Sequence, residues 1–308
     1  MTPPDASSLA NIAFGTMQFG GSASASQSQA MFEACLARGI RHFDTAYIYT
    51  EGASEKILGA LVQAERDSLF IATKCGYLGG AGQTTILQQF DASRKRLDLD
   101  SIDLLYMHRF DPDTPLEETF ETLAGLQDTG KIRFIGVSNY AAWQVMKAQA
   151  VAHRFGTRID VIQPMYSLVK RQAEVEILPM CQSEGILAAT YSPLGGGLLT
   201  GKYIDGHGQG RLADDARYAA RYGLEEMHKT AAGLSAVARD LGTDPATLAV
   251  AWVMQHAAQP APILSARSPE QLMPSLAALT YPMDESLYAR ISALSRTPAP
   301  ATDRLEEA

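Results

Sequence analysis

The sequence predicts an α/β protein with the (β/α)8 TIM barrel fold, and three observations support this prediction. Short apolar runs recur eight times along the chain, and segments with helical spacing of apolar residues separate them. The runs are continuous and not alternating, which is typical of parallel strands buried on both faces. Eight strand and helix units favour a closed barrel over an open doubly wound sheet. We therefore expect one barrel domain over residues 1–308.

Each predicted strand is a short run rich in apolar and β-branched residues. Polar or glycine-containing segments end every run, and this limits each strand to a few residues. Because consecutive strands are separated by a helix, right-handed crossovers should join them in parallel. In chain order the predicted strands are residues 11–16, 40–46, 69–75, 102–109, 132–139, 159–166, 186–193 and 261–267.

The predicted helices occupy the segments between these runs. Gly39 and Gly185 directly follow the last apolar positions of two of them and should be left-handed caps. The first six helices are residues 27–39, 53–64, 85–97, 115–130, 141–156 and 171–185.

Residues 194–260 form a longer segment between the last two strands. It contains a glycine-rich stretch, a polar loop at residues 206–211 and helices at 225–242 and 244–257, and we expect an insertion over the barrel mouth. A last helix at residues 284–295 should precede a flexible tail from about residue 296 to 308.

Composition excludes several classes of protein. Apolar residues make up 46% of the chain, enough for a sizeable core, and the net charge of -8 without any basic run argues against nucleic-acid binding. No segment has the length or the flanks of a membrane span or a signal peptide, so we expect a cytoplasmic protein. Three distant cysteines form neither a disulfide framework nor a metal site: Cys35, Cys75 and Cys181.

Every predicted strand ends on polar or reactive side chains. Taken singly, such a residue is more often a helix cap, a solvated end or a structural histidine. In a parallel barrel, however, all strand carboxyl ends open on the face that carries active sites, so these side chains should converge. They are Thr16, Asp44, Lys74, His108, Ser138, Asn139, Gln163, Tyr191, Ser192, Ser265 and Arg267.

Three of these endings, together with Tyr49, suggest a proton-transfer site. Tyr49 lies five residues after Asp44, and a phenol with a pKa near ~10 needs help to exchange a proton at neutral pH. The ammonium of Lys74 would stabilise the phenolate, by on the order of 4 kcal/mol at about 4 Å. Asp44 would keep that ammonium charged, and His108 could donate a hydrogen bond to a substrate oxygen.

Several motifs resemble the aldo-keto reductase superfamily over nearly the whole chain: FDTAYIYTEGASEKILG, IATK, LLYMHRFD, GVSNY, YSPLGGGLLTGKY and SPEQL. The resemblance implies that Asp44, Tyr49, Lys74 and His108 are the catalytic residues, which leaves Tyr47 to packing. It also implies a barrel that binds a nicotinamide dinucleotide, usually NADPH, across its mouth. No GxGxxG motif follows a strand, so a Rossmann domain is not expected.

The same resemblance implies which residues hold the cofactor. Ser138, Asn139 and Gln163 would bind the carboxamide, Tyr191 would stack on the ring, and the loop ending at Lys202 would hold the pyrophosphate. Because Pro274 and Ser275 stand where many members carry Glu and Asn, NADH is also possible. The full set is Thr16, Met17, Ser138, Asn139, Gln163, Tyr191, Ser192, Pro193, Leu194, Gly195, Gly197, Lys202, Ser265, Arg267 and Gln271.

Other functions are weighed against the reductase. GGLLTGKY nearly fits a phosphate-binding loop of NTPases, but Tyr203 replaces the Ser or Thr that would bind magnesium. Reduction of an aldehyde or ketone by NADPH is the first hypothesis. The alternatives are an NAD(P)-dependent dehydrogenase of a sugar or a pyridoxine-like alcohol, and a cofactor-binding subunit similar to potassium-channel beta subunits. The substrate is a small carbonyl compound or alcohol of open identity, and the chain is expected to be a monomer or a small homo-oligomer.

Overall fold

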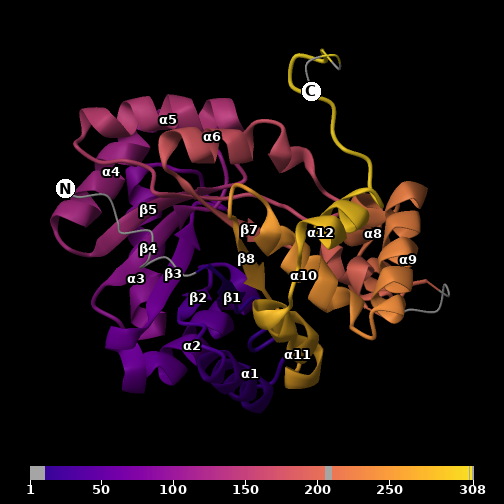
Figure 1. Cartoon of the computed structure of the whole chain (residues 1–308). Coiled ribbons are helices and arrows are strands. Elements are labelled where there is room, and N and C mark those ends of the chain that lie inside the picture. Colours follow the sequence, from indigo (N-terminus) through magenta and orange to yellow (C-terminus); the bar gives the residue numbers. More distant parts are fainter. Residues whose placement is uncertain (1–10, 205–209, 305, 307–308) are drawn as a thin grey trace.

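A closed barrel of eight parallel strands forms the centre of the computed structural model, which describes residues 11–204, 210–304 and 306 (Figure 1). Each strand pairs with the next, and the eighth pairs with the first. The (β/α)8 barrel is thus confirmed, and every predicted run contains one strand. The strands are β1 (Ala13–Gly15), β2 (His42–Asp44), β3 (Phe70–Cys75), β4 (Ile102–Met107), β5 (Ile132–Ser138), β6 (Val161–Gln163), β7 (Leu187–Tyr191) and β8 (Ala261–Leu264).

Helices cover the outside of the barrel, as the spacing of apolar residues predicts. Ser24 begins the first helix with a capping box to Gln27, and Gly185 ends the sixth in the left-handed conformation. The sixth helix is shorter than expected, because Glu174 is held by Arg171 and Tyr166 before it begins. The helices are α1 (Ala25–Ala37), α2 (Ala53–Val62), α3 (Gln83–Leu97), α4 (Leu116–Asp128), α5 (Ala142–Arg154) and α6 (Ile177–Glu184).

The long segment after β7 adds a group of helices on the side of the barrel opposite α3 and α4 (Figure 1). The two long helices that the sequence predicts are present, and two short ones, α7 and α8, are additional. The predicted polar loop lies mostly outside the described residues. The elements are η5 (Gly195–Thr200), α7 (Arg211–Asp214), α8 (Ala216–Tyr222), α9 (Glu225–Asp240) and α10 (Pro245–Gln255).

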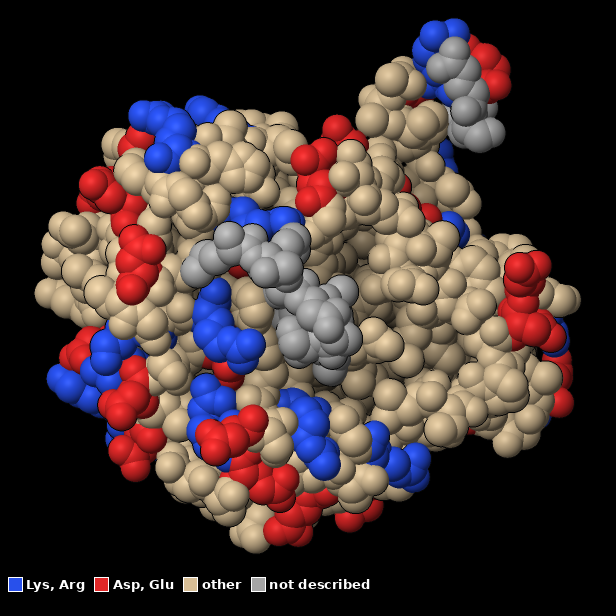
Figure 2. Space-filling model, turned by 60° about the vertical axis from the view of Figure 1, so that its left-hand side comes forward, with Lys and Arg blue, Asp and Glu red and all other residues tan. Residues whose placement is uncertain are grey.

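Two helices follow β8, namely α11 (Pro269–Ala277) and α12 (Glu285–Ser292). Residues 296–304 contain no helix or strand, and their flexibility stays a prediction. Among the described helices, none is both long and apolar enough to cross a bilayer. Figure 2 shows acidic and basic side chains intermixed over the face that it presents.

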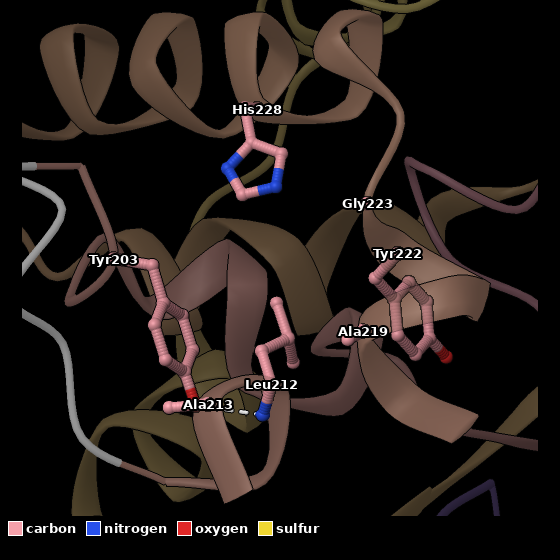
Figure 3. Close-up of a pocket in the computed structure, with 7 residues that line it drawn as sticks. All are labelled: Tyr203, Leu212, Ala213, Ala219, Tyr222, Gly223 and His228. Carbon is pink, nitrogen blue, oxygen red and sulfur yellow. Dashed lines mark hydrogen bonds between the residues drawn. The ribbon is translucent and has the colours of Figure 1, made fainter. Parts of the chain in front are cut away.

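A pocket of about 250 Å³ opens within the inserted segment (Figure 3). None of the predicted site residues lines this pocket. His228 and Tyr222 both line it, and the hydroxyl of Tyr222 points away from His228. The pocket is therefore lined by residues of the inserted segment and not by the strand ends. Its lining residues are Tyr203, Leu212, Ala213, Ala219, Tyr222, Gly223 and His228.

The strands are buried on both faces, as continuous apolar runs predict. One large apolar cluster fills the space between the strands and the helices. A smaller cluster, which includes Phe70, Leu104 and Phe134, fills the inside of the barrel. His42 precedes Asp44 by two residues and so faces the inside, where its ring meets the edge of Phe70 at 4.7 Å between centroids.

His42 makes stability depend on pH. Burial, and then the charge of Lys74, lower the pKa of His42 to about 3. The unfolded chain takes up a proton near pH ~6.5, so between that pH and about 3 only the unfolded state gains from protonation. We expect the free energy of unfolding to fall on acidification by up to ~1.4 kcal/mol per pH unit from this group.

The His42→Leu variant isolates this effect. The difference in unfolding free energy between wild type and variant, measured by urea titration from pH 7 to pH 4, should change in favour of the variant as the pH falls. Other titrating groups, such as Asp160 with a pKa raised by burial to about 6, are common to both proteins and cancel. A constant difference across this range would contradict the neutral buried imidazole.

Candidate active site

The carboxyl end of the barrel brings three of the four predicted catalytic residues into direct contact. The ammonium of Lys74, at the end of β3, forms an ion pair with Asp44 at the end of β2. It also donates to the backbone oxygen of Thr45 at 2.8 Å and to the hydroxyl of Tyr49 at 3.3 Å. Asp44 and Lys74 are almost completely buried. A carboxylate, an ammonium and a phenol thus form one connected group.

A second set of polar groups fixes Asp44 from the other side. The side-chain amide of Gln163 donates to Asp44 Oδ2 at 2.9 Å, from the end of β6 across the barrel. Thr16 donates to the backbone oxygen of Asp44 at 3.2 Å and shares a hydrogen bond of 2.8 Å with Ser54. Buried polar groups with several partners are held in one geometry. The carboxylate is therefore positioned independently of any ligand.

The turn after β2 directs Tyr49 towards Lys74. Thr50 and Glu51 take left-handed conformations with φ of 46° and 55°. Such strain persists where the surrounding structure over-determines the backbone. Tyr47 has a different role, since its ring packs under the guanidinium of Arg96 at 4.5 Å. The two phenols of this segment are therefore separated, and only that of Tyr49 reaches the ammonium.

The pKa of Tyr49 is shifted upwards, whereas the effect of Lys74 considered from the sequence predicts a downward shift. Burial raises the pKa of the phenol, and the charge of Lys74 lowers it by less, so the net pKa lies above its usual value. For Lys74, burial alone would lower the pKa, but Asp44 and Tyr49 raise it above its usual value. At neutral pH the phenol is thus protonated and the ammonium charged. The group is set up to give a proton.

His108 follows β4 and stands beside Tyr49. The two rings meet edge to face with centroids 5.9 Å apart, and Tyr77 contacts the other side of the imidazole at 5.0 Å. Burial, followed by the charges of Lys74 and Arg109, lowers the pKa of His108 to about 3. The imidazole is neutral at pH 7 and can donate one hydrogen bond.

Residues at the ends of β5 and β7 form a further hydrogen-bonded group next to His108. Asn139 has a left-handed φ of 58° and donates to the backbone oxygen of His108 at 3.0 Å. Its side-chain oxygen accepts from the hydroxyl of Tyr191 at 2.7 Å, and Ser138 donates to the backbone oxygen of Gln163 at 3.0 Å. These contacts link the predicted carboxamide-binding residues to the predicted catalytic group.

The glycine-rich loop after β7 contains backbone without side chains, and the ammonium of a lysine lies next to part of it. Ser192 and Gly195 through Gly197 all have positive φ. A Cβ added to Gly197 would lie 3.6 Å from the ammonium of Lys202, so this cation stands directly over the backbone. Backbone of this kind, next to a cation, suits an anion. Pro193 and Leu194 complete the loop between Ser192 and η5.

Met17 directly follows Thr16 after β1, whereas Ser265, Arg267 and Gln271 lie near the start of α11. Ser265 and Gln271 are exposed, and the side chain of Gln271 accepts from the backbone of Arg267 at 3.3 Å. In the described part of the chain, no hydrogen bond connects this turn to the Asp44 and Lys74 group. Pro274 lies inside α11, and its backbone oxygen accepts from Thr247 at 2.7 Å.

Comparison with known proteins agrees with this geometry. The chain matches the Aldo/keto reductase family over residues 11–296. It belongs to this family. The chain is accordingly an NAD(P)-dependent oxidoreductase with a barrel fold, as the sequence motifs predict.

Curated relatives of this aldo/keto reductase include proteins of different kinds. "Uncharacterized oxidoreductase YrpG" of Bacillus subtilis is 31% identical over 92% of this chain and 91% of its own length. "Probable voltage-gated potassium channel subunit beta" of Arabidopsis thaliana is 31% identical over 79% of each chain. "Aflatoxin B1 aldehyde reductase member 2" of Rattus norvegicus is 38% identical over 61% of this chain and 53% of its own length.

Sequence reasoning missed several residues of the aldo/keto reductase site. Tyr106 lies beside Lys74, whose ammonium is 5.8 Å from its ring centroid, and Gly136 leaves room for that ring. Its position two residues before His108 could have indicated it, because alternate strand residues share a face. Cys75, the neighbour of Lys74 in the chain, belongs to the apolar cluster between strands and helices and contacts Met107. No pattern in the sequence indicated Tyr218 of α8.

Proposed function

We propose that this aldo/keto reductase reduces an aldehyde or ketone to the alcohol with NADPH, and that Tyr49 is the general acid. The observation that carries the proposal is the buried contact of Tyr49 with the Lys74 and Asp44 ion pair. A protonated phenol beside a fixed ammonium can donate its proton as charge develops on a carbonyl oxygen. Lys74 then stabilises the phenolate that is left, and Asp44 keeps Lys74 charged.

His108 orients the substrate in this proposal. Its neutral imidazole stands beside the Tyr49 ring and can donate to the same carbonyl oxygen. Two donors that converge on one oxygen fix the direction of the carbonyl plane. The raised pKa of Tyr49 also favours reduction at neutral pH, because alcohol oxidation needs the phenol in its deprotonated form.

The donor set around the mouth fits a nicotinamide dinucleotide. Asn139 is exposed and hydrogen-bonded to Tyr191, and Ser138 and Gln163 add a hydroxyl and an amide beside it. We propose that these three hold the carboxamide and that Lys202, with the glycine backbone, holds the phosphates. Arg267 suits a 2'-phosphate through its planar fork of donors. When bound, the reduced nicotinamide supplies the hydride.

A relative named as an aldehyde reductase supports a carbonyl substrate, while the potassium-channel relative keeps a regulatory subunit as an alternative. The test is a screen of NADPH and NADH consumption at pH 7 with aldehydes, ketones and sugars. We expect turnover with NADPH and an aldehyde or ketone. Sugar oxidation with a strong preference for NAD would favour the dehydrogenase. If none of the tested substrates is turned over, the regulatory subunit would be favoured.

A further inference from the structure

Two tyrosines of α8 form a platform on the glycine-rich loop. The rings of Tyr218 and Tyr222 stack with centroids 6.3 Å apart, and a Cβ added to Gly196 would lie 2.9 Å from Tyr222 and 3.0 Å from Tyr218. The ring of Tyr222 is completely buried, and its hydroxyl contacts the sulfur of Met165 at 3.6 Å. The short helix is therefore fixed against the end of the barrel by ring packing.

Cations lie over both rings. Arg211 lies over Tyr218 at 5.2 Å and donates to its hydroxyl at 3.3 Å, and a second cation lies over the same ring. The guanidinium of Arg221 lies 5.5 Å from the ring centroid of Tyr218, and the ammonium of Lys170 lies 5.8 Å from that of Tyr222. Lys170 comes from the segment after β6, where two backbone hydrogen bonds with Ser167 hold its position. In the part of the chain that the structure describes, neither Arg221 nor Lys170 has a carboxylate at ion-pair distance.

This pair of cations differs from the other basic side chain of α8. Arg217 binds Asp215 with a contact of 2.9 Å and is thereby neutralised. Lys170 and Arg221 instead repel each other electrostatically. Burial, and then the charge of Arg221, lower the pKa of Lys170. Two like charges without a counter-ion repel, and a bound anion would remove that repulsion.

The pair stands at the mouth of the barrel. The charge of Arg221 acts on the hydroxyl of Tyr191, where it opposes the effect of burial on the pKa. The packing agrees with this position, because the hydroxyl of Tyr222 contacts the sulfur of Met165, and the backbone of Met165 pairs with Tyr191 at the end of β7. Tyr191 in turn is hydrogen-bonded to Asn139 at 2.7 Å. A small molecule with its carbonyl at Tyr49 could thus extend towards α8.

We propose that Lys170 and Arg221 form a subsite for an anionic group, carboxylate or phosphate, of the carbonyl substrate. The inference rests on the proposed reductase function and names its substrate class as short aldehydes or ketones that carry a negative charge. Arg221 supplies a planar fork that matches either anion, and Lys170 supplies a second charge from the neighbouring loop. The tyrosine platform keeps both cations in place before the substrate arrives.

The experiment compares matched substrates with the complete protein and NADPH. The pairs are 4-oxobutanoate with butanal and glyceraldehyde 3-phosphate with glyceraldehyde, and the measured quantity is the ratio of kcat/KM for the charged to the neutral member. Wild type should prefer the charged member of at least one pair. Arg221→Met should lower that ratio by about 10- to 100-fold, the range for hydrogen bonds to charged groups, and Lys170→Met by less. Arg154→Met, which changes the net charge equally in an exposed pair with Glu117, is the control.

The outcomes separate this inference from the proposed function. Turnover of neutral aldehydes with unchanged ratios in both variants overturns the subsite and leaves the reductase intact. A raised KM for NADPH with unchanged ratios also overturns it, because the cations would then serve a cofactor phosphate. If wild type turns over neither member, calorimetric titration with succinate and with 3-phosphoglycerate decides: binding by wild type that Arg221→Met weakens supports the subsite, and equal or no binding overturns it.

Discussion

Replacing Tyr49 with phenylalanine should lower kcat for carbonyl reduction by roughly 10²- to 10⁴-fold, the usual contribution of a positioned general acid. The ring and its edge contact with His108 remain, so only the hydroxyl 3.3 Å from Lys74 is lost. Affinity for NADPH should hardly change, because the lost group acts only as the proton moves. Single-turnover kinetics and fluorescence titration of the cofactor measure the two quantities.

Tyr47→Phe is the matched control for this substitution. Tyr47 lies in the same segment, but its ring packs under Arg96, away from the ammonium of Lys74. Its variant should retain kcat within a few-fold. Comparable activity of Tyr49→Phe and wild type would show that another group donates the proton, and the proposed mechanism would then be abandoned.

Much of the fold could be predicted because its signals are local. Buried parallel strands need continuous apolar runs, and a helix such as α1 needs a cap at Ser24 and apolar residues at helical spacing. Closure of the barrel followed from the number of units alone. The short helices α7 and α8 were missed because their stability comes from contacts with the glycine-rich loop, which leave no periodic pattern in so few residues.

The candidate site also has some features that could be predicted from the sequence and others that could not. That Asp44 would meet Lys74 followed from adjacent strand ends, since parallel strands place their carboxyl ends on one face. That Gln163 would hold Asp44 from across the barrel could not be predicted, because it depends on side-chain directions inside the barrel. The charge of Lys74 alone predicts a lowered pKa for Tyr49, whereas burial raises this pKa by more. Burial is a property of the assembled structure.

Variants of the Lys74 and Asp44 ion pair should affect catalysis and stability in different ways. Lys74→Met leaves the carboxylate of Asp44 buried with Gln163 but without a cation, and Asp44→Asn leaves a buried ammonium. Breaking a buried pair from one side costs about 3–5 kcal/mol, so each single variant should unfold at clearly lower urea concentration. Reductase activity should fall strongly in both.

The double variant Lys74→Met with Asp44→Asn contains no unpaired buried charge. It should recover most of the lost unfolding free energy, because replacing both partners of a buried pair is often close to neutral. Activity should not recover, since no cation is left to stabilise the phenolate of Tyr49. Recovery of stability without activity would mean that the pair is kept for proton transfer. If the losses of the single variants simply added in the double variant, the two charges would not be coupled, and the role of Asp44 as the group that keeps Lys74 charged would be wrong.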